Sequence, residues 1–178
     1  MYKRQHLYRS PLGTITLAAD SEGLTGLWFE GQKYFAATLD ARHEETMLPI
    51  FEQTRRWLDN YFGGNDPGPT PPLHLQGSPF RLAVWEILRQ IPFGKTITYG
   101  EIAREIARRQ GSKTVPAQAV GGAVGHNPVS IIVPCHRVVG SNGSLTGYAG
   151  GIERKVRLLA LEKADMTGLF APQKGTAL

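Results

Sequence analysis

Cysteine is almost absent from this chain, which has a single one, Cys135, among its 178 residues. One cysteine excludes an internal disulfide, and it excludes a zinc site built from several cysteines. A chain that needs no disulfide fits a reducing compartment. We therefore expect the protein in the cytoplasm.

Long apolar runs are also missing. No run approaches the roughly 20 residues that a helix needs to span a bilayer. Residues 1–13 lack the apolar core of a signal peptide. With a hydrophobic share of 41%, the sequence predicts a soluble globular protein that has no membrane partner.

Charge is divided unevenly along the chain. Residues 1–76 carry 7 Lys and Arg against 9 Asp and Glu, whereas residues 77–178 carry 13 against 6. A basic field attracts polyanions, so the second part suits a nucleic-acid partner. A basic surface that serves only solubility would have the same composition, and charge alone favours neither interpretation.

The first part of the chain predicts a small sheet followed by a helix. Residues 7–29 have the pattern of a β-hairpin, with strands at 12–19 and 24–29 joined by turn residues. A further strand is expected near 34–39. Residues 47–62 place apolar side chains on one helical face and charged ones on the other, which predicts an amphipathic helix.

Glycine and proline are concentrated in residues 63–77, which predict a connection between two subdomains. The expected organisation is an N-terminal sheet-and-helix subdomain over 1–76 and a C-terminal domain over 77–165. Residues 166–178 show no periodicity and predict a frayed tail.

Three short helices are expected after the connection. Ser78 and Pro79 are residue types typical of an N-cap and a first helical position, and Thr98 with Glu101 fits a capping box. The third helix is expected over 117–126, and a last helix begins at Ile152 and runs to about Lys163. Short helices followed by extended segments are typical of a winged helix-turn-helix, so we predict an α+β fold.

The third expected helix is rich in small residues. It includes Gly121 and Gly122, and each interior glycine costs of order 1 kcal/mol of helix stability. Something must offset this cost. Either another element packs closely on the helix, or its backbone approaches a ligand such as a DNA groove.

The β-branched residues of 129–133 predict a short buried strand that Pro134 ends. Cys135 then stands at the mouth of this element, directly before His136. A neighbouring imidazole can lower the pKa of a thiol from about 8.5 toward neutrality and make it a nucleophile. A lone cysteine is more often a small buried hydrophobe, and adjacency to a histidine alone does not decide between the two.

Residues 127–140 read NPVSIIVPCHRVVG, and residues 147–151 read GYAGG. Both stretches resemble the active site of the O6-alkylguanine-DNA alkyltransferases, also called methylated-DNA-protein-cysteine methyltransferases. The resemblance is clear over 78–163 and looser over the first 75 residues.

The resemblance implies repair of double-stranded DNA. An alkyl group would move from O6-alkylguanine, and also from O4-methylthymine, onto Cys135 after the base flips out of the duplex. A thioether is not hydrolysed, so each chain would act once. Zinc-bearing members hold the metal with cysteines that this chain lacks, so we predict no metal and no cofactor. We expect a monomer.

The resemblance also assigns catalytic roles. Cys135 would be activated by His136, which Glu162 would orient, and Tyr99 would donate a proton to the departing guanine. The residues alone leave other interpretations open, since Glu162 suits a solvated helix end and Tyr99 suits a helix core. Arg137 would either contact DNA or form a buried ion pair.

Binding residues follow from the same resemblance. The resemblance identifies the third expected helix as the recognition helix, and Asn127 would tie it to the active-site strand. The remaining positions are those that would line the base pocket, Val138, Tyr148 and Ala149, and those that would contact DNA, Thr98, Gln118, Ala119, Gly121 and Gly122.

Gln118 stands where better-known family members have an arginine that fills the gap left by the flipped base. A glutamine can fill space and form hydrogen bonds with the unpaired cytosine, but it brings no charge, so flipping would be weaker or slower. Alternatively, Gln118 is simply an exposed helix residue.

Two other functions stay open at this stage. An alkyltransferase-like protein that binds damage without repairing it is suggested by Gln118, although such relatives typically lack the cysteine. A Cys-His hydrolase is the other, but no oxyanion-hole motif is recognisable in the sequence.

Overall fold

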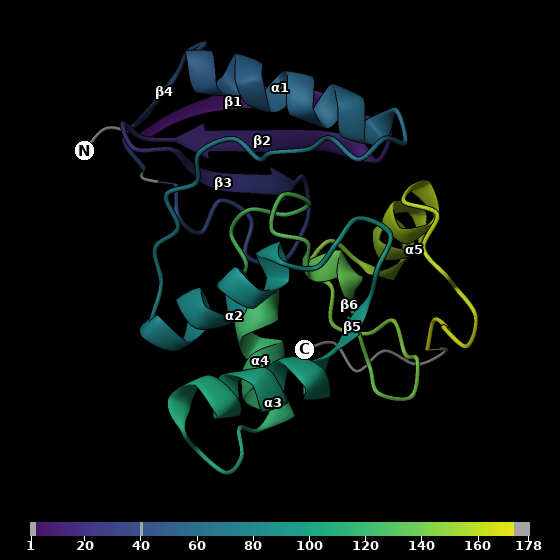
Figure 1. The fold of residues 1–178 in the computed structure, drawn as a ribbon. Coiled ribbons are helices and arrows are strands. Elements are labelled where there is room, and N and C mark those ends of the chain that lie inside the picture. Colours follow the sequence, from purple (N-terminus) through teal and green to yellow (C-terminus); the bar gives the residue numbers. More distant parts are fainter. Residues whose placement is uncertain (1–2, 40, 173–178) are drawn as a thin grey trace. The chain divides into compact units, whose positions relative to one another are not determined.

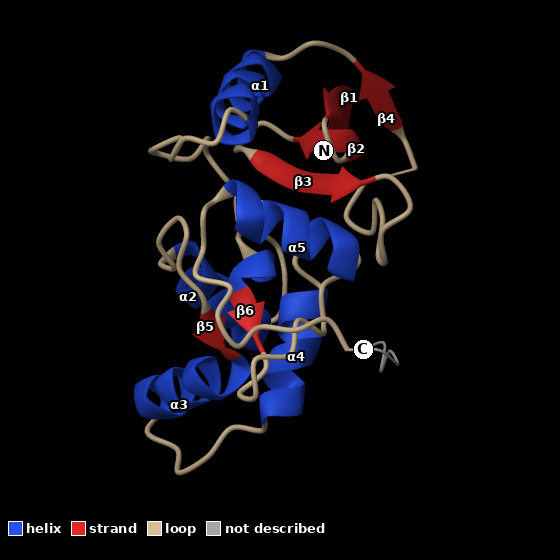
Figure 2. Cartoon of the chain, turned by 90° about the vertical axis from the view of Figure 1, so that its right-hand side faces the viewer, coloured by secondary structure: helices blue, strands red, loops and turns tan. Residues whose placement is uncertain are grey.

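The computed structural model describes residues 3–39 and 41–172 (Figure 1). The chain divides into two compact units. The first comprises Met1–Gln76 together with the short segment Pro128–Ile132, and the second comprises Gly77–Asn127 and Val133–Leu178. The first unit contains the four-stranded sheet and one helix, and the second is mainly helical, which confirms the α+β prediction (Figure 2).

The first unit is a twisted sheet with a helix on one face. Its strands are arranged in the order β3-β2-β1-β4, in which only β1 and β4 are parallel. Helix α1 covers the sheet (Figure 1), and the Tyr8 hydroxyl donates to Asp59 of this helix over 2.8 Å. The bounds are β1 (Lys3–Ser10), β2 (Gly13–Ala19), β3 (Leu24–Phe29), β4 (His43–Glu45) and α1 (Pro49–Phe62).

The predicted hairpin is confirmed by the antiparallel pairing of β2 with β3, in which Ile15 lies opposite Phe29. Strand β1, which pairs with β2 from Arg4 to Ser10, was not predicted as a strand. The predicted strand near 34–39 is wrong. Tyr34 and Ala36 have φ values of 56° and 55°, and the backbone there closes turns on itself.

The second unit contains the helices α2 (Pro79–Arg89), α3 (Tyr99–Gln110), α4 (Ala117–Gly125) and α5 (Ile152–Leu161). A 3-10 helix, η1 (Cys135–Arg137), lies between α4 and α5, and the two-residue strands β5 (Ile97–Thr98) and β6 (Val138–Val139) pair in parallel. Since β6 follows η1 directly, this pairing fixes η1 beside the start of α3.

Both predicted N-caps are confirmed. The Ser78 side chain accepts a hydrogen bond from the backbone N–H of Arg81, and Thr98 with Glu101 forms a complete capping box. Each of these bonds satisfies a backbone N–H group of the first helical turn, which has no acceptor within the helix. Local sequence thereby fixes where α2 begins, after the connection over 63–77, and where α3 begins, after β5.

The predicted strand over 129–133 is wrong, although its residues are buried as expected. Only Val129 makes a strand-like bridge, to Leu27, and Ile131 has a φ of 70°. Proline at 128 and at 134 removes backbone donors on both sides, so no ladder can continue. The segment is a buried turn.

The predicted frayed tail is wrong over residues 166–170. Met166 and Leu169 pack on the buried side chains of Val139 and Leu159. The backbone of Phe170 exchanges hydrogen bonds with residues 143 and 145. Residues 173–178, which the same prediction included, lie outside the described part.

Within the described residues, no helix combines the length and the apolar character that crossing a membrane requires.

Candidate active site

The candidate nucleophile lies at the first position of η1, immediately after Pro134. The Cys135 side chain is 3% exposed, so the structure buries the thiol instead of placing it at the mouth of a strand. The Asn127 amide nitrogen lies 3.1 Å from the sulfur and donates to the Val133 carbonyl over 2.7 Å. Asn127 therefore links the end of α4 to the turn that carries Cys135.

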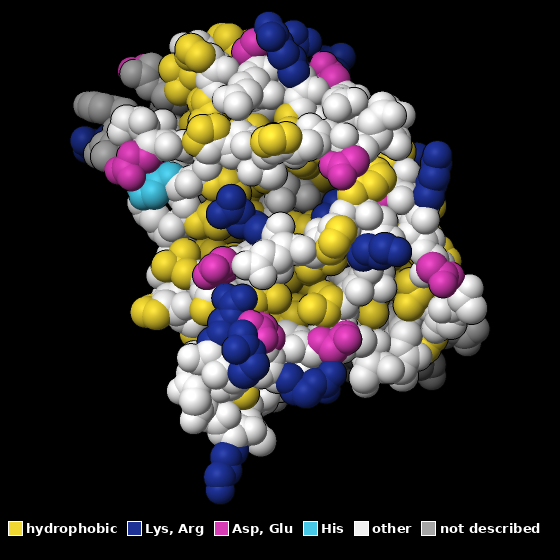
Figure 3. Space-filling model, in the orientation of Figure 1, with side chains coloured by type: hydrophobic (Ala, Val, Ile, Leu, Met, Phe, Trp, Pro, Cys, Tyr) yellow, Lys and Arg dark blue, Asp and Glu magenta, His cyan; other side chains and the backbone are white. Residues whose placement is uncertain are grey.

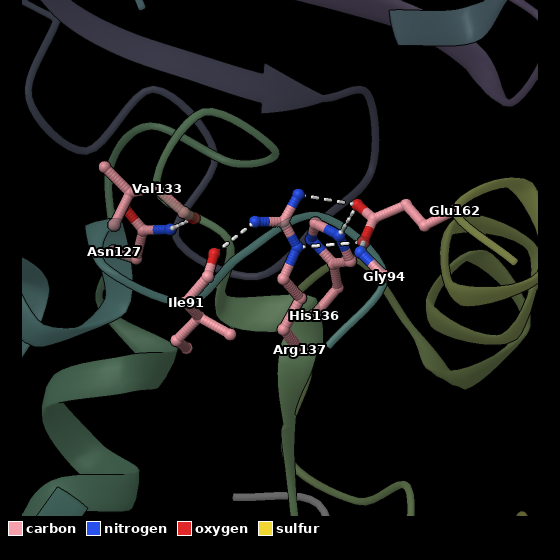
Figure 4. A network of polar contacts seen from close by, with 7 residues as sticks. All are labelled: Ile91, Gly94, Asn127, Val133, His136, Arg137 and Glu162. Carbon is pink, nitrogen blue, oxygen red and sulfur yellow. Dashed lines mark hydrogen bonds and ion pairs between the residues drawn. The ribbon is translucent and has the colours of Figure 1, made fainter. Parts of the chain in front are cut away.

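His136 and Glu162 meet in the buried interior of the second unit (Figure 4). The His136 Nε2 atom lies 2.7 Å from Glu162 Oε1. A carboxylate can only accept, so Nε2 carries the proton and Nδ1 is the basic nitrogen of the neutral ring. The 3-10 turn and the C-cap of α5 thus orient the imidazole.

Arg137 binds the same carboxylate. Its Nε and Nη2 atoms each donate to a Glu162 oxygen over 2.9 Å, and its Nη1 donates to the Ile91 carbonyl over 2.6 Å. The backbone N–H of Gly94 adds a further bond of 3.0 Å to Glu162. Of the two roles left open for Arg137, the structure shows the buried ion pair.

Gly94 has to be a glycine at this point. Its φ is 73°, and a Cβ atom would lie 2.8 Å from the Glu162 carbonyl oxygen. Any side chain would therefore push the loop after α2 away from the carboxylate that it binds.

The electrostatics of this cluster set its protonation. Burial alone would raise the pKa of the Glu162 carboxyl, but the hydrogen bonds from His136 and Arg137 hold the pKa well below its usual range. Burial lowers the pKa of His136. The carboxylate is therefore ionised and the imidazole neutral at neutral pH, so Nδ1 can accept a proton.

The thiol is protonated at rest. Burial raises the pKa of Cys135, although the Asn127 amide and the positive charge of Lys155 act in the opposite direction. A thiol of this kind becomes nucleophilic only when a base takes its proton. His136, the next residue, is the neutral base with a tautomer suited to that task.

Tyr99 is the first residue of α3 and lies close to the thiol. Its hydroxyl donates to the Thr146 carbonyl over 3.2 Å, and the Gly147 carbonyl lies 3.4 Å away. Burial raises the pKa of Tyr99, and the charge of a Cys135 thiolate raises it further. Tyr99 therefore keeps its proton at neutral pH and can act as a donor.

The residues predicted to line a base pocket lie around this cluster. Val138 follows η1 and is buried, and the Tyr148 ring stands edge-on to His136 with ring centres 6.3 Å apart. Ala149 is half-buried. Gly150 makes this arrangement possible, because a Cβ atom there would lie 2.5 Å from the Tyr148 ring.

The predicted DNA contacts on helix α4 differ in their exposure to solvent. Gln118, Ala119 and Gly122 are exposed, whereas Gly121 is buried. A Cβ atom on Gly122 would meet no atom within 4 Å in the described chain outside the helix's own backbone. Close packing therefore does not explain Gly122, and approach to a ligand is the alternative that remains. Thr98 lies at the start of α3, where it caps the helix.

Family models match both units. Residues 3–73 match the ribonuclease-like domain of 6-O-methylguanine DNA methyltransferase, and residues 79–164 match its DNA-binding domain. The chain belongs to this family. The buried thiol, imidazole and carboxylate of this methyltransferase thus lie in the part that matches the DNA-binding domain.

The similar proteins of other organisms belong to the same family. The methylated-DNA-protein-cysteine methyltransferase of Haemophilus influenzae is 42% identical over 157 residues, which cover 88% of this methyltransferase and 84% of the relative. That of Methanosarcina acetivorans is 42% identical over 156 residues, covering 88% and 96%. The crystal structure of Mycobacterium tuberculosis OGT in complex with DNA is 40% identical with a TM-score of 0.77, covering 96% of this chain and 99% of that one.

One buried charge of the methyltransferase was not predicted. Lys155 of α5 has no exposed surface, whereas the apolar residues Ile152 and Val156 of the same helix are half-buried. A lysine inside a run of charged residues gives no signal in the sequence that distinguishes it from its exposed neighbours.

Proposed function

We propose that this methyltransferase repairs DNA by moving one methyl or larger alkyl group from O6-alkylguanine in double-stranded DNA onto Cys135. O4-methylthymine is a second substrate. One observation carries the proposal: the only thiol of the sequence, Cys135, is buried and directly precedes His136, an imidazole that is oriented by the buried Glu162 carboxylate.

The bond changes are those of a displacement at the alkyl carbon. The Cys135 proton moves to His136 Nδ1, directly or through a water, and Glu162 stabilises the imidazolium that forms. The sulfur attacks the alkyl carbon, the S–C bond forms, and the C–O6 bond breaks. The electron pair stays with guanine, which takes up a proton, so that the thiol hydrogen is exchanged overall for the alkyl group.

Tyr99 supports the departure of guanine by donating its proton or a hydrogen bond as charge develops on the ring. Its hydroxyl is held near the sulfur by the Thr146 carbonyl, and its raised pKa keeps it a donor. Val138, Tyr148 and Ala149 line the space that the base enters, and Asn127 fixes α4 against η1.

Contact with DNA is assigned to the second unit. Exposed cations of α3 and the loop after it, Arg104, Arg108 and Lys113, belong to this unit, and Lys and Arg side chains gather over α3 in Figure 3. Such a surface attracts phosphates. Helix α4, with Gln118, Ala119 and the Gly121-Gly122 backbone, enters the groove, and Thr98 contacts a phosphate.

Base flipping is required by the burial of the acceptor. Cys135 is 3% exposed, so its sulfur cannot reach O6 inside a stacked duplex, and the alkylated base leaves the stack and enters the protein. Residues 77–165 hold the acceptor and the DNA surface, and residues 1–76 form an N-terminal subdomain. We assign the protein to the cytoplasm as a monomer.

Intact-mass measurement tests the proposal. After incubation with a duplex that holds one O6-methylguanine, we expect each chain to gain one methyl group, localised to Cys135 by peptide mapping. The undamaged duplex serves as the control. Tight binding of the damaged duplex without a mass change would identify a damage-binding protein, and repeated turnover of an ester would identify a hydrolase; both outcomes contradict the proposal.

The Tyr99→Phe substitution is expected to lower the single-turnover transfer rate by about tenfold or more. The substitution removes the donor but keeps the ring, so DNA affinity should change little. Rapid-quench kinetics with saturating protein measures the rate, and fluorescence anisotropy measures the affinity. A large loss of affinity with an unchanged rate would make Tyr99 a DNA contact instead of a donor.

The Gln118→Arg substitution is expected to raise the rate of base flipping and to tighten binding of the damaged duplex about three- to tenfold at low salt. Arginine adds a positive charge and a planar group on the exposed side of α4. A 2-aminopurine reporter beside the lesion would follow flipping. Gln110→Arg, at the exposed end of α3, adds the same charge as a control, and equal effects of both variants would leave no special role for position 118.

A further inference from the structure

Lys155 is a fully buried lysine on α5. Its Nζ atom donates to the carbonyls of Val138 and Thr146, the latter over 3.0 Å. Burying an ammonium is costly even with hydrogen bonds, and an apolar side chain of similar volume is often at least as stable at such a position. Stability alone therefore does not explain a lysine here.

The two carbonyls connect Lys155 to the proposed chemistry. Val138 follows the 3-10 turn that carries Cys135 and His136. The Thr146 carbonyl, which accepts from Lys155, also accepts from the Tyr99 hydroxyl over 3.2 Å. One ammonium thus fixes the segment after the nucleophile and the acceptor that orients the proton donor.

We propose that Lys155 is a positioning residue for alkyl transfer, whose ammonium favours the Cys135 thiolate and holds the Thr146 carbonyl that orients Tyr99. This inference rests on the proposed function for its role in repair. Its effect on the thiol is independent of DNA.

The physical basis is the charge that appears during the reaction. When the Cys135 proton moves to His136, a buried anion forms, and a nearby buried cation lowers the cost because screening by water is weak there. The titratable groups that face Lys155 are Cys135 and His136 of η1 and, through the shared carbonyl, Tyr99 of α3.

A pH dependence follows. Burial lowers the pKa of Lys155 to about 8, although the charge of Cys135 acts to raise it. Lys155 is charged at neutral pH and loses its proton as the pH rises through about 8. The thiolate then loses its counter-charge, so the transfer rate should fall above this pH even though higher pH favours deprotonation of thiols in general.

Lys155→Met tests the inference, because methionine has a similar length and no charge. We expect single-turnover transfer from the O6-methylguanine duplex to be about tenfold slower at neutral pH, which corresponds to roughly one unit in the pKa of the thiol. The wild-type rate should fall above about pH 8, and the variant should lack this fall. A purely structural role would lower the rate by one factor at every pH. Arg157→Met, on the exposed side of α5, is the matched control.

A second measurement separates this inference from the proposed function. Carbamidomethylation of Cys135 by iodoacetamide without DNA, followed by intact mass, should be about tenfold slower in Lys155→Met than in the wild type. If alkylation by iodoacetamide is slower in Lys155→Met but the wild type gains no methyl group from DNA, the repair function is contradicted and the effect of Lys155 on the thiol is supported. Equal rates of the two proteins in both assays would overturn the inference. If the variant does not fold, a wild-type rate that stays level or rises between about pH 7.5 and 9 would overturn it.

Discussion

Cys135→Ser should accept no methyl group from an O6-methylguanine duplex above the background of spontaneous loss. The hydroxyl has a far higher pKa than the thiol and is a much weaker nucleophile beside the same base. Serine keeps a polar atom for the Asn127 amide, so the turn that joins α4 to η1 should remain intact. Transfer of label from a methyl-labelled duplex, counted on the protein, measures the effect.

DNA binding provides the control for this variant. Because the exposed side of α4 and the cations of α3 are unchanged, the affinity of Cys135→Ser for the damaged duplex should stay within about twofold of the wild type. Labelled protein from the serine variant would mean that another residue accepts the methyl group.

Glu162→Gln is expected to slow transfer about a hundredfold or more. The neutral amide no longer stabilises an imidazolium, and its NH2 group faces the donors of His136 and Arg137, which both point at this position. The histidine tautomer in which Nδ1 can accept the thiol proton is then no longer enforced. Rapid-quench kinetics measures the loss.

The same substitution should also destabilise the fold. It leaves the buried Arg137 guanidinium without its counter-charge, for which a loss of about 3 kcal/mol in the free energy of unfolding is expected in urea titrations. Glu153→Gln removes an equal charge from the exposed first turn of α5 and should change neither stability nor rate. A folded Glu162→Gln protein with the wild-type rate would show that the carboxylate does not serve the thiol.

The pH dependence of the free energy of unfolding should also report the ionised Glu162 carboxylate. The pKa of Glu162 is held low in the folded protein, so its contribution is complete above the ordinary carboxyl value of about 4.3 and is lost as the pH falls through the folded value. The acid limb of a stability profile should therefore be less steep in Glu162→Gln than in the wild type.

Local rules allowed accurate prediction of the helix starts. Ser78 and Thr98 cap their helices with side-chain bonds that span three residues, so the sequence nearby contains all the necessary information. The amphipathic helix near 49–62 was predicted for the same reason. Cys135 and His136 were singled out by their chemistry and by the motif around them.

Long-range contacts account for what was missed. Strand β1 reads KRQHLYRS, a polar segment that becomes a strand only because β2 and β4 pair with its two edges. Residues 129–133 have strand propensity, yet flanking prolines and a bridge to Leu27 bend them into a turn. Lys155 is buried because carbonyls from two distant segments meet it, which no pattern within α5 reveals.

The segment after α5 also limits where this protein can be shortened or extended. The backbone bonds of Phe170 to residues 143 and 145 brace the loop that leads to the Thr146 carbonyl. A chain cut at Asp165 would uncover the apolar side chains beneath Met166 and Leu169. A fluorophore or affinity handle at the C-terminal end should therefore be attached after Phe170, so that it does not disturb the loop whose Thr146 carbonyl orients Tyr99.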